Sequence, residues 1–272
     1  MDKRDQAQGP IGDLVAGLRG SSRERLLERR TQRRGQSRAI TIDGEHAIEA
    51  SEGEKARAAL LLRRCARVQP EMRARPAGFF DVADVAVRIA GLGSLGMERY
   101  IALVAGEGGP DGMRLIDIKR ARASCAVAAS RLRQPGWSCE AERVAAVQGR
   151  MQARPPAFLG QVADRSRSYV IRELQPREDR LDLAGLAGVG GAQLETAIES
   201  FARLAAWAHL RGAGRQGAAG AEALAEYGQK EKWRERLLLA ATQCAARSRA
   251  DWQVFCKAFD AGAFRQGSSG SL

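Results

Sequence analysis

Five short segments of the chain have the composition and the alternation of apolar and polar residues that are typical of β-strands. The first three follow one another closely, so we expect them to form a meander of antiparallel strands. The pattern therefore predicts a sheet of about five strands. The five segments are residues 85–90, 99–104, 113–119, 158–159 and 169–174.

Other parts of the chain carry apolar residues at the three- and four-residue spacing of helices. Ser51 is followed by Glu54 at the third position, which predicts a capping box at the start of one of these helices. An Asp43-Gly44 pair between β-prone segments predicts a hairpin over residues 38–48. The predicted helices cover residues 12–34 with a break at 20–22, 51–66, 140–151, and 194–264 with a break at 212–220.

Together these elements predict an α+β fold, in which an antiparallel sheet of about five strands precedes a mainly helical C-terminal region. The last residues after Gln266 are expected to be disordered. Four tryptophans, Trp137, Trp207, Trp233 and Trp252, are expected to pack in a core. The expected parts are a helical N-terminal segment with a short hairpin (1–78), a lobe of sheet and helix (79–176), a helical region (177–265) and a tail (266–272).

Composition adds a strong positive charge to this picture. The chain has 272 residues and a formal net charge of +12, with its densest arginine cluster at residues 19–38. This cluster is either a solvated helical face or a binding surface for nucleic acid or an acidic protein, although no aromatic residue is interleaved in it to stack on bases. The five cysteines are widely spaced and odd in number, so we expect free thiols and no metal site. No apolar stretch approaches the length of a membrane span and the N-terminal residues lack a secretory pattern, which predicts a cytoplasmic protein without a membrane partner.

The clearest chemical motif is a glycine loop, residues 91–96 (GLGSLG), followed by Lys119. Two folds use such a loop: a Rossmann loop leads from a strand into a helix, whereas a kinase loop leads from one antiparallel strand into the next. Residues 97–104 favour a strand, and Lys119 stands where a Rossmann fold would have an acidic residue. The loop is therefore interpreted as a kinase-like phosphate loop with its lysine on the third strand, and a tight turn with a surface lysine is the alternative.

Further positions complete this interpretation. A carboxylate on the helix after Lys119 should orient the lysine, and Glu140 and Glu142 are the candidates. Glu173 lies where a kinase hinge would offer backbone groups to adenine, and a strand end before Pro176 is the alternative. The predicted cofactor-binding residues are Gly91, Gly93, Ser94, Gly96, Lys119, Glu142 and Glu173, and the predicted cofactor is ATP without an evident metal site.

Several separate motifs resemble the bacterial family known as domain of unknown function 2252, over about residues 12–265. That family is similar to protein kinases and aminoglycoside phosphotransferases, with the lobes in permuted order, so the resemblance implies a kinase-like small lobe. The segments that carry the resemblance are 25–31 (RLLERRT), 87–96 (VRIAGLGSLG), 99–103 (RYIAL), 158–160 (FLG), 169–176 (YVIRELQP) and 202–209 (ARLAAWAH).

The same resemblance implies that something needed for catalysis is missing from this sequence. Members carry a Gly-Asp-x-His-x-x-Asn motif and an Asn-Asp-Phe-Asp motif, which the resemblance equates with the catalytic loop and the metal-binding aspartate. Neither motif occurs here, and neither His46 nor His209 follows Gly-Asp. The expectation is a truncated or split family member that retains nucleotide binding and is inactive alone, either as a degenerate remnant or as the partner of a separately encoded catalytic half. The alternatives are a non-enzymatic basic module that binds nucleic acid or an acidic protein, and an ATP-dependent phosphotransferase that uses other acidic residues.

Overall fold

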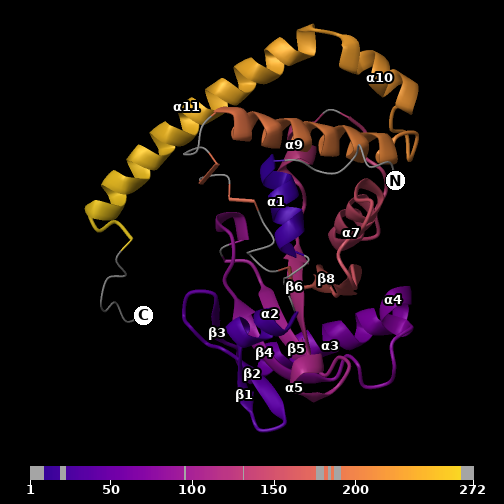
Figure 1. Ribbon diagram of the computed structural model, residues 1–272, viewed down its shortest axis with the longest axis vertical. Coiled ribbons are helices and arrows are strands. Elements are labelled where there is room, and N and C mark those ends of the chain that lie inside the picture. Colours follow the sequence, from indigo (N-terminus) through magenta and orange to yellow (C-terminus); the bar gives the residue numbers. More distant parts are fainter. Residues whose placement is uncertain are drawn as a thin grey trace. The chain divides into compact units, whose positions relative to one another are not determined.

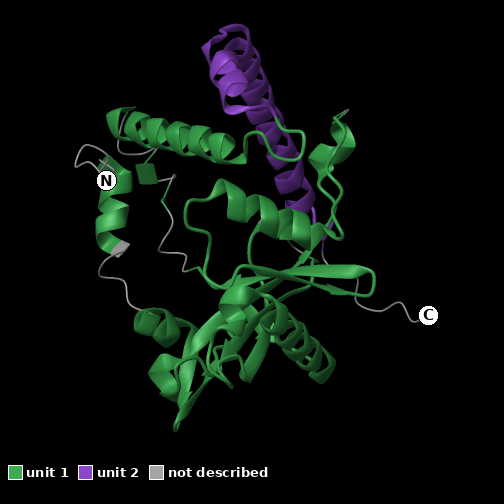
Figure 2. Cartoon of the chain, turned by 90° about the vertical axis from the view of Figure 1, so that its right-hand side faces the viewer, with its two compact units in different colours: residues 1–218 green, residues 219–272 purple. Residues whose placement is uncertain are grey.

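The computed structural model describes residues 9–18, 23–94, 96–130, 132–175, 181–182, 185–186 and 191–264. The chain divides into two compact units, residues 1–218 and residues 219–272 (Figure 2). The first unit holds all the described strands, and the second is helical. The four-part division expected from the sequence stays a prediction, and the tail at 266–272 lies outside the described residues.

The centre of the first unit is a six-stranded sheet with the order β3-β4-β5-β6-β8-β7 (Figure 1). Every neighbouring pair in it is antiparallel. This sheet and the helices confirm the predicted α+β class. The strands are β3 (Ala47–Glu49), β4 (Val82–Arg88), β5 (Arg99–Val104), β6 (Arg114–Ala121), β7 (Gly160–Asp164) and β8 (Arg167–Glu173).

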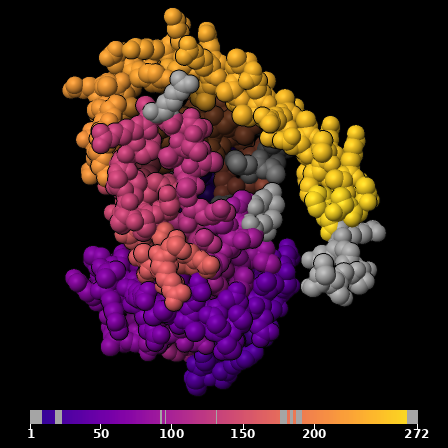
Figure 3. Space-filling view, turned by 180° about the vertical axis from the view of Figure 1, so that it is seen from behind, coloured from indigo at the N-terminus to yellow at the C-terminus, as the bar shows by residue number. Residues whose placement is uncertain are grey.

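The predicted meander corresponds to β4, β5 and β6, and the last predicted strand to β8. The strand expected at residues 158–159 is wrong, because Phe158 has a positive φ of 60° and its buried ring packs against Phe79 and Phe80. The strand begins two residues later, as β7. Figure 3 shows the β7–β8 hairpin (salmon) at the surface beside α7 (pink) and the α3–α4 segment (violet).

One face of the sheet is covered by α3 (Glu52–Val68) and α4 (Pro70–Arg73). The predicted capping box is confirmed, because the Ser51 hydroxyl accepts from the Glu54 N–H and the Glu54 carboxylate accepts from the Ser51 N–H. Apolar side chains of α3 and of alternate strand residues form a continuous core between helix and sheet. Burial raises the pKa of the Cys65 thiol in this core to about 12. The core includes Leu61, Leu62, Cys65, Tyr100, Ala102, Ile116, Ile118, Tyr169 and Ile171.

The other face carries a second, smaller core with the N-terminal elements α2 (Arg23–Arg30), β1 (Thr31–Arg34) and β2 (Ser37–Ile40). Leu27 of α2 is fully buried there, together with Leu103 of β5 and Leu115 of β6. The helix predicted to continue to residue 34 ends at Arg30.

The hairpin predicted at residues 38–48 is wrong. Strand β2 pairs instead with β1 around a turn at Gly35, whereas β3 pairs with β4 of the large sheet. The Asp43 carboxylate accepts from the backbone N–H groups of Glu45, His46 and Ala47, so residues 43–47 form a closed loop rather than a two-residue turn.

The remaining helices confirm the other helical predictions. They are α1 (Gly9–Leu18), α5 (Gly109–Gly112), α6 (Cys125–Ala129), α7 (Glu140–Met151) and α9 (Gly191–Gly212) in the first unit, with a 3-10 turn at Leu92–Ser94, and α10 (Ala221–Gln229) and α11 (Lys232–Asp260) in the second. All five cysteines are free thiols, as predicted. Trp207 and Trp252 are 47% and 63% exposed, so their predicted core packing is wrong.

Candidate functional site

The face of the sheet opposite α3 changes from apolar to charged along the strands. Strand residues of one face meet across the ladder, and here Leu103 pairs with Leu115, Ile101 with Asp117, and Arg99 with Lys119. The charged pairs come last, at the end of the strands where the loop between β4 and β5 lies. The strand pairing thus assembles the charged groups beside the glycine loop.

Asp117 is the centre of this charged group. Its carboxylate is buried and accepts two hydrogen bonds from Arg99, from Nε and Nη2, both at 2.8 Å. Arg88 Nη1 donates to the same carboxylate at 3.0 Å, and Arg172 Nε lies 3.7 Å from it. We call Asp117 with Arg88, Arg99 and Arg172 the Asp117 cluster. Such a bidentate, charge-assisted pair fixes the side chains in one geometry.

Three arginines around one carboxylate also set its protonation. Burial acts to raise the pKa of Asp117, but the hydrogen bonds from Arg99 and the attraction of Arg88 outweigh burial and hold the pKa below its ordinary value. Asp117 is therefore ionised, and the cluster keeps an excess of two positive charges.

Lys119 lies next to this cluster on the same face of β6. Partial burial lowers the pKa of Lys119, and repulsion from Arg99 lowers it further, while Asp117 acts in the opposite direction. Within the part of the chain that the structure describes, no carboxylate forms an ion pair with Lys119. An anionic ligand would relieve this repulsion, which makes Lys119 a candidate phosphate ligand.

A cavity of about 750 Å³ opens in front of Lys119, and we call it the Lys119 cavity. Its charged lining is one carboxylate, Asp117, against four cations. Two glycines of the loop, Gly93 and Gly96, form part of the wall, and Val144 and Gln148 of α7 form another part. The cavity therefore joins the loop and lysine that the sequence singled out. The four cations are Lys119, Arg120, Arg122 and Arg172.

The loop itself connects two antiparallel strands, β4 and β5, as the kinase-like interpretation expects and a Rossmann loop would not. Gly91 and Gly96 have positive φ values of 74° and 73°, a conformation that favours glycine. A Cβ atom at Gly93 would meet nothing within 4 Å. The Ser94 N–H donates to the Gly91 carbonyl at 3.0 Å, which closes a turn inside the loop. The loop thus leaves open space over the cavity for a ligand.

The carboxylates expected to orient Lys119 have other partners. Glu142 accepts hydrogen bonds from the N–H and the hydroxyl of Ser138, at 2.6 and 2.7 Å, and so joins the first turn of α7 to the residue before its N-cap, Cys139. Glu140 pairs with Arg143 at 2.7 Å. In the described residues neither glutamate pairs with Lys119, and the nearest carboxylate along its own strand is Asp117.

Glu173, the predicted hinge residue, bonds to other residues of the fold through its backbone and its side chain. The Glu173 N–H donates to the Ala157 carbonyl and the Leu174 N–H donates to the Leu115 carbonyl, both at 2.8 Å. The Glu173 carboxylate pairs with Arg114 at 2.7 Å. Both amides and the carboxylate therefore bind within the fold, and a role of Glu173 in recognising adenine stays a prediction.

The N-terminal arginine cluster is tied to the connection between β5 and β6. Arg33 and Arg38 pair with Asp111 at 2.5 and 2.8 Å, and Arg23 pairs with Glu107 at 3.4 Å. These ion pairs fasten the β1–β2 hairpin to the sheet. They also reduce the positive charge that this cluster can offer to a polyanion.

Sequence reasoning missed the Asp117 cluster. A signal was present, since Asp117 interrupts an otherwise aliphatic strand two residues before Lys119, and an acid at such a position is buried only with partners. Its partners come from β4, β5 and β8, so identifying them needed the register of three strand pairs.

The described residues offer neither a membrane span nor a cluster of metal ligands. No helix among them combines the length and the apolar character of a transmembrane segment. No group of three or more His, Cys, Asp or Glu residues in these same ranges could hold a metal ion.

Comparison with known protein families matches residues 1–258 to the family described as "Uncharacterized protein conserved in bacteria (DUF2252)". No curated protein and no solved structure matches the chain. The match covers nearly the whole sequence, and the chain belongs to this family.

Proposed function

We propose that this protein binds a nucleotide such as ATP through its phosphate groups in the Lys119 cavity. The observation that carries the proposal is the charge of this cavity. Lys119 has no ion-pair partner among the described residues, and the one lining carboxylate, Asp117, is already bonded to arginines. Phosphates are the small ligands that suit such a site, because arginine and lysine donate charge-assisted hydrogen bonds to their oxygens.

The order of the elements supports a kinase-like lobe. A glycine loop joins the first two strands, a lysine lies on the third, a helix follows, and two further strands complete the sheet. In protein kinases the corresponding loop covers the phosphates and the lysine contacts them. By this correspondence the loop residues Gly91, Gly93, Ser94 and Gly96 would hold the phosphates together with Lys119, and Asp117 would position the neighbouring cations. Of these loop residues, Gly93 and Gly96 line the cavity itself.

We further propose that phosphoryl transfer needs a second polypeptide that carries the Gly-Asp-x-His-x-x-Asn motif. Helix α9 supports this idea, because five of its large apolar side chains are 40–56% exposed. They are Ile198, Phe201, Leu204, Trp207 and Leu210. Mixing this chain with a polypeptide that contains the motif should then give ATP-dependent transfer, and the Phe201→Glu and Trp207→Glu variants should abolish it. Unchanged transfer in both variants would reject α9 as the contact surface.

Calorimetric titration with ATP, with and without Mg²⁺, tests nucleotide binding directly. Lys119→Ala should weaken binding by roughly tenfold to a hundredfold, the size expected for a lost hydrogen bond to a charged group. Lys55→Ala is the matched control, because Lys55 is a lysine on the opposite, α3 side of the sheet and pairs with Glu52. Equal affinities in Lys119→Ala and wild type, or no binding at millimolar ATP, would reject the proposal.

A further inference from the structure

A second cavity lies on the same face of the sheet as the Lys119 cavity and is lined by different side chains. Its volume is about 410 Å³, and we call it the Arg30 cavity. Small-molecule sites commonly span about 300–1,000 Å³, so this space suits a small ligand. Arg88 lines it and pairs with Asp117, which lines the Lys119 cavity, so the Asp117 cluster separates the two spaces.

Part of the wall of the Arg30 cavity is hydrocarbon. Leu26 comes from α2, Ile101 from β5, and Leu174 follows β8, so three separate elements meet there. Ile40 and Ala47 add to the same wall. These residues are buried members of the smaller core, which makes the wall a fixed surface.

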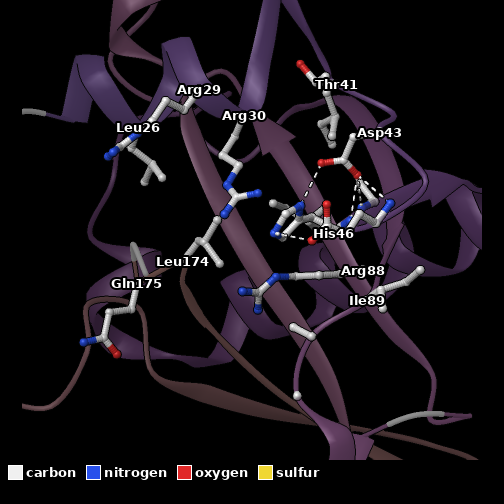
Figure 4. A pocket seen from close by; sticks show the side chains of 16 residues that line it. Leu26, Arg29, Arg30, Thr41, Asp43, His46, Arg88, Ile89, Leu174 and Gln175 are labelled. Atoms are coloured by element: carbon white, nitrogen blue, oxygen red, sulfur yellow. Dashed lines mark hydrogen bonds and ion pairs between the residues drawn. The ribbon is translucent and has the colours of Figure 1, made fainter. Parts of the chain in front are cut away.

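Basic groups converge on the same space. Figure 4 shows the guanidinium groups of Arg30 and Arg88 and the imidazole of His46 directed toward one another across the cavity. Arg88 is held in place by its 3.0 Å hydrogen bond to Asp117. The Arg30 guanidinium has no hydrogen-bond or ion-pair partner within the described ranges. Arg30 therefore brings a full positive charge and a planar set of donors that the fold does not use.

His46 is oriented by Asp43, which lies 2.9 Å from its Nδ1 atom (Figure 4). Burial acts to raise the pKa of Asp43, but hydrogen bonds from the N–H groups of Ala47 and His46 outweigh it and hold the pKa well below its ordinary value. Asp43 is therefore ionised and accepts from the Nδ1–H group, a pairing that fixes the ring and its tautomer. The ring is thereby pre-positioned at the cavity.

The balance of charge favours an anion. Arg29, Arg30 and Arg88 line the cavity against two carboxylates, Asp43 and Glu45. Asp43 is already bonded to three backbone N–H groups and to His46, and the Glu45 side chain is 81% exposed. Arg88 is paired with Asp117 and Glu45 lies 4.0 Å from His46 Nε2, so the positive charge that remains for a ligand is that of Arg30.

We propose that the Arg30 cavity binds a small ligand that carries a carboxylate or phosphate group on a short hydrocarbon body. The anionic end would take the planar donors of Arg30 with those of Arg88 and His46, and the body would lie against Leu26, Ile101 and Leu174. The proposal does not depend on nucleotide binding, because none of these residues lines the Lys119 cavity.

The test is calorimetric titration at constant ionic strength with butyrate, n-butyl phosphate and the neutral butyramide. One of the two anions should bind, and which one binds identifies the anionic group; butyramide should not. Arg30→Gln should weaken the binding of that anion by roughly tenfold to a hundredfold, and Arg30→Lys should weaken it less, since lysine keeps the charge but loses the planar donors.

Two controls locate the effect. Arg63→Gln makes the same change at an exposed residue of α3, on the other face of the sheet, and should leave the affinity unchanged. Lys119→Ala should also leave it unchanged, which separates this site from the nucleotide site. The proposal is overturned if neither anion binds at millimolar concentration, or if butyramide binds as well as the anions. It is also overturned if Arg30→Gln binds the anion like wild type, or if only Lys119→Ala loses affinity for the anion.

Discussion

The two faces of the six-stranded sheet use the same strands in opposite ways. On the α3 face, Tyr100, Ile116 and Ile118 pack into a closed apolar core. On the other face, their neighbours Arg99 and Asp117 form an ion pair, and Asp117 and Lys119 line the Lys119 cavity. Because successive strand residues point to opposite faces, one short sequence can supply a rigid support and a charged site together. The first face is therefore a closed apolar support, whereas the second combines a buried network of ion pairs with open cavities.

The largest effect should come from breaking the Asp117 cluster. Asp117→Asn removes the charge that balances Arg99, whose side chain is only 8% exposed, and the loss of a buried partner destabilises proteins by about 3–5 kcal/mol. Denaturant unfolding measures this change. Asp164→Asn is the control, since Asp164 pairs with the half-exposed Arg64 and should cost less than about 1 kcal/mol. Equal losses in the two variants would show that the charged face is not a buried network.

The same residue predicts a pH dependence. The pKa of Asp117 is lowered by folding, so its contribution is present above the pKa of the unfolded chain and is lost as the pH falls through the lowered pKa of the folded protein. Unfolding free energy should therefore fall on acidification below about pH 4, the ordinary range of aspartate. The Asn variant should show a shallower fall, and an identical slope in both proteins would contradict this assignment.

A smaller loss should follow a packing change on the α3 face. A Cβ atom at Gly160 would lie 2.6 Å from Cys65 Sγ and 3.0 Å from Gln69 Cγ, so Gly160→Ala should cost about 1–3 kcal/mol through overpacking. Gly149→Ala should instead stabilise the protein. A Cβ atom there would meet nothing within 4 Å, and alanine is favoured over glycine inside a helix such as α7 by about 0.5–1 kcal/mol. Thermal or denaturant unfolding of both variants measures the sign and the size of the change in unfolding free energy. A Gly160→Ala protein more stable than wild type would contradict the close contact with Cys65.

Two substitutions in the glycine loop should change different properties, one the stability of the protein and the other its affinity for ATP. Gly96→Ala forces a positive φ on alanine and should cost about 1–2 kcal/mol. Gly93→Ala meets no such strain and should leave the unfolding free energy nearly unchanged, while its methyl group projects into the space over the cavity and weakens ATP binding. Unfolding and ATP titrations of this pair check both statements. A Gly93→Ala protein with wild-type ATP affinity would exclude a close approach of phosphate to this residue.

The smallest effect concerns the protonation of Lys119. Its pKa is lowered in the free protein by burial and by Arg99, and a bound phosphate should raise it. Binding should then take up protons in the range between the lowered pKa and the ordinary value of about 10.4, and affinity should decline as the pH rises through this range. Titrations in buffers of different ionisation enthalpy measure the uptake. Lys119→Ala should show none, and equal uptake in both proteins would assign it to another group.

Local patterns in the sequence predicted most of the strands and helices, but only some of the residues at the Lys119 cavity. The alternation in residues 99–104 and the Ser51–Glu54 capping box depend on neighbours in the chain, and both were found correctly. Gly93, Gly96 and Lys119 were singled out because the loop and the lysine form a recognisable motif. They line one cavity, and their binding of a nucleotide stays a prediction.

The errors involve interactions that local patterns do not report. The Asp117 cluster depends on the register of four strands. Glu142 accepts hydrogen bonds from Ser138, and its role beside Lys119 stays a prediction. The hairpin at 38–48 failed because Asp43 binds three amides of its own loop. Trp207 was expected in a core because it is aromatic, whereas its exposure depends on which surfaces the fold leaves uncovered.

Amide chemical shifts during an ATP titration test the central claim most directly, because they report both faces of the sheet in one experiment. The signals of Gly93, Gly96 and Lys119 should move with ATP, while those of Leu61 and Cys65 in α3 should stay in place. Shifts confined to other parts of the chain, or no shifts at millimolar ATP, would contradict a phosphate site at the charged end of the sheet.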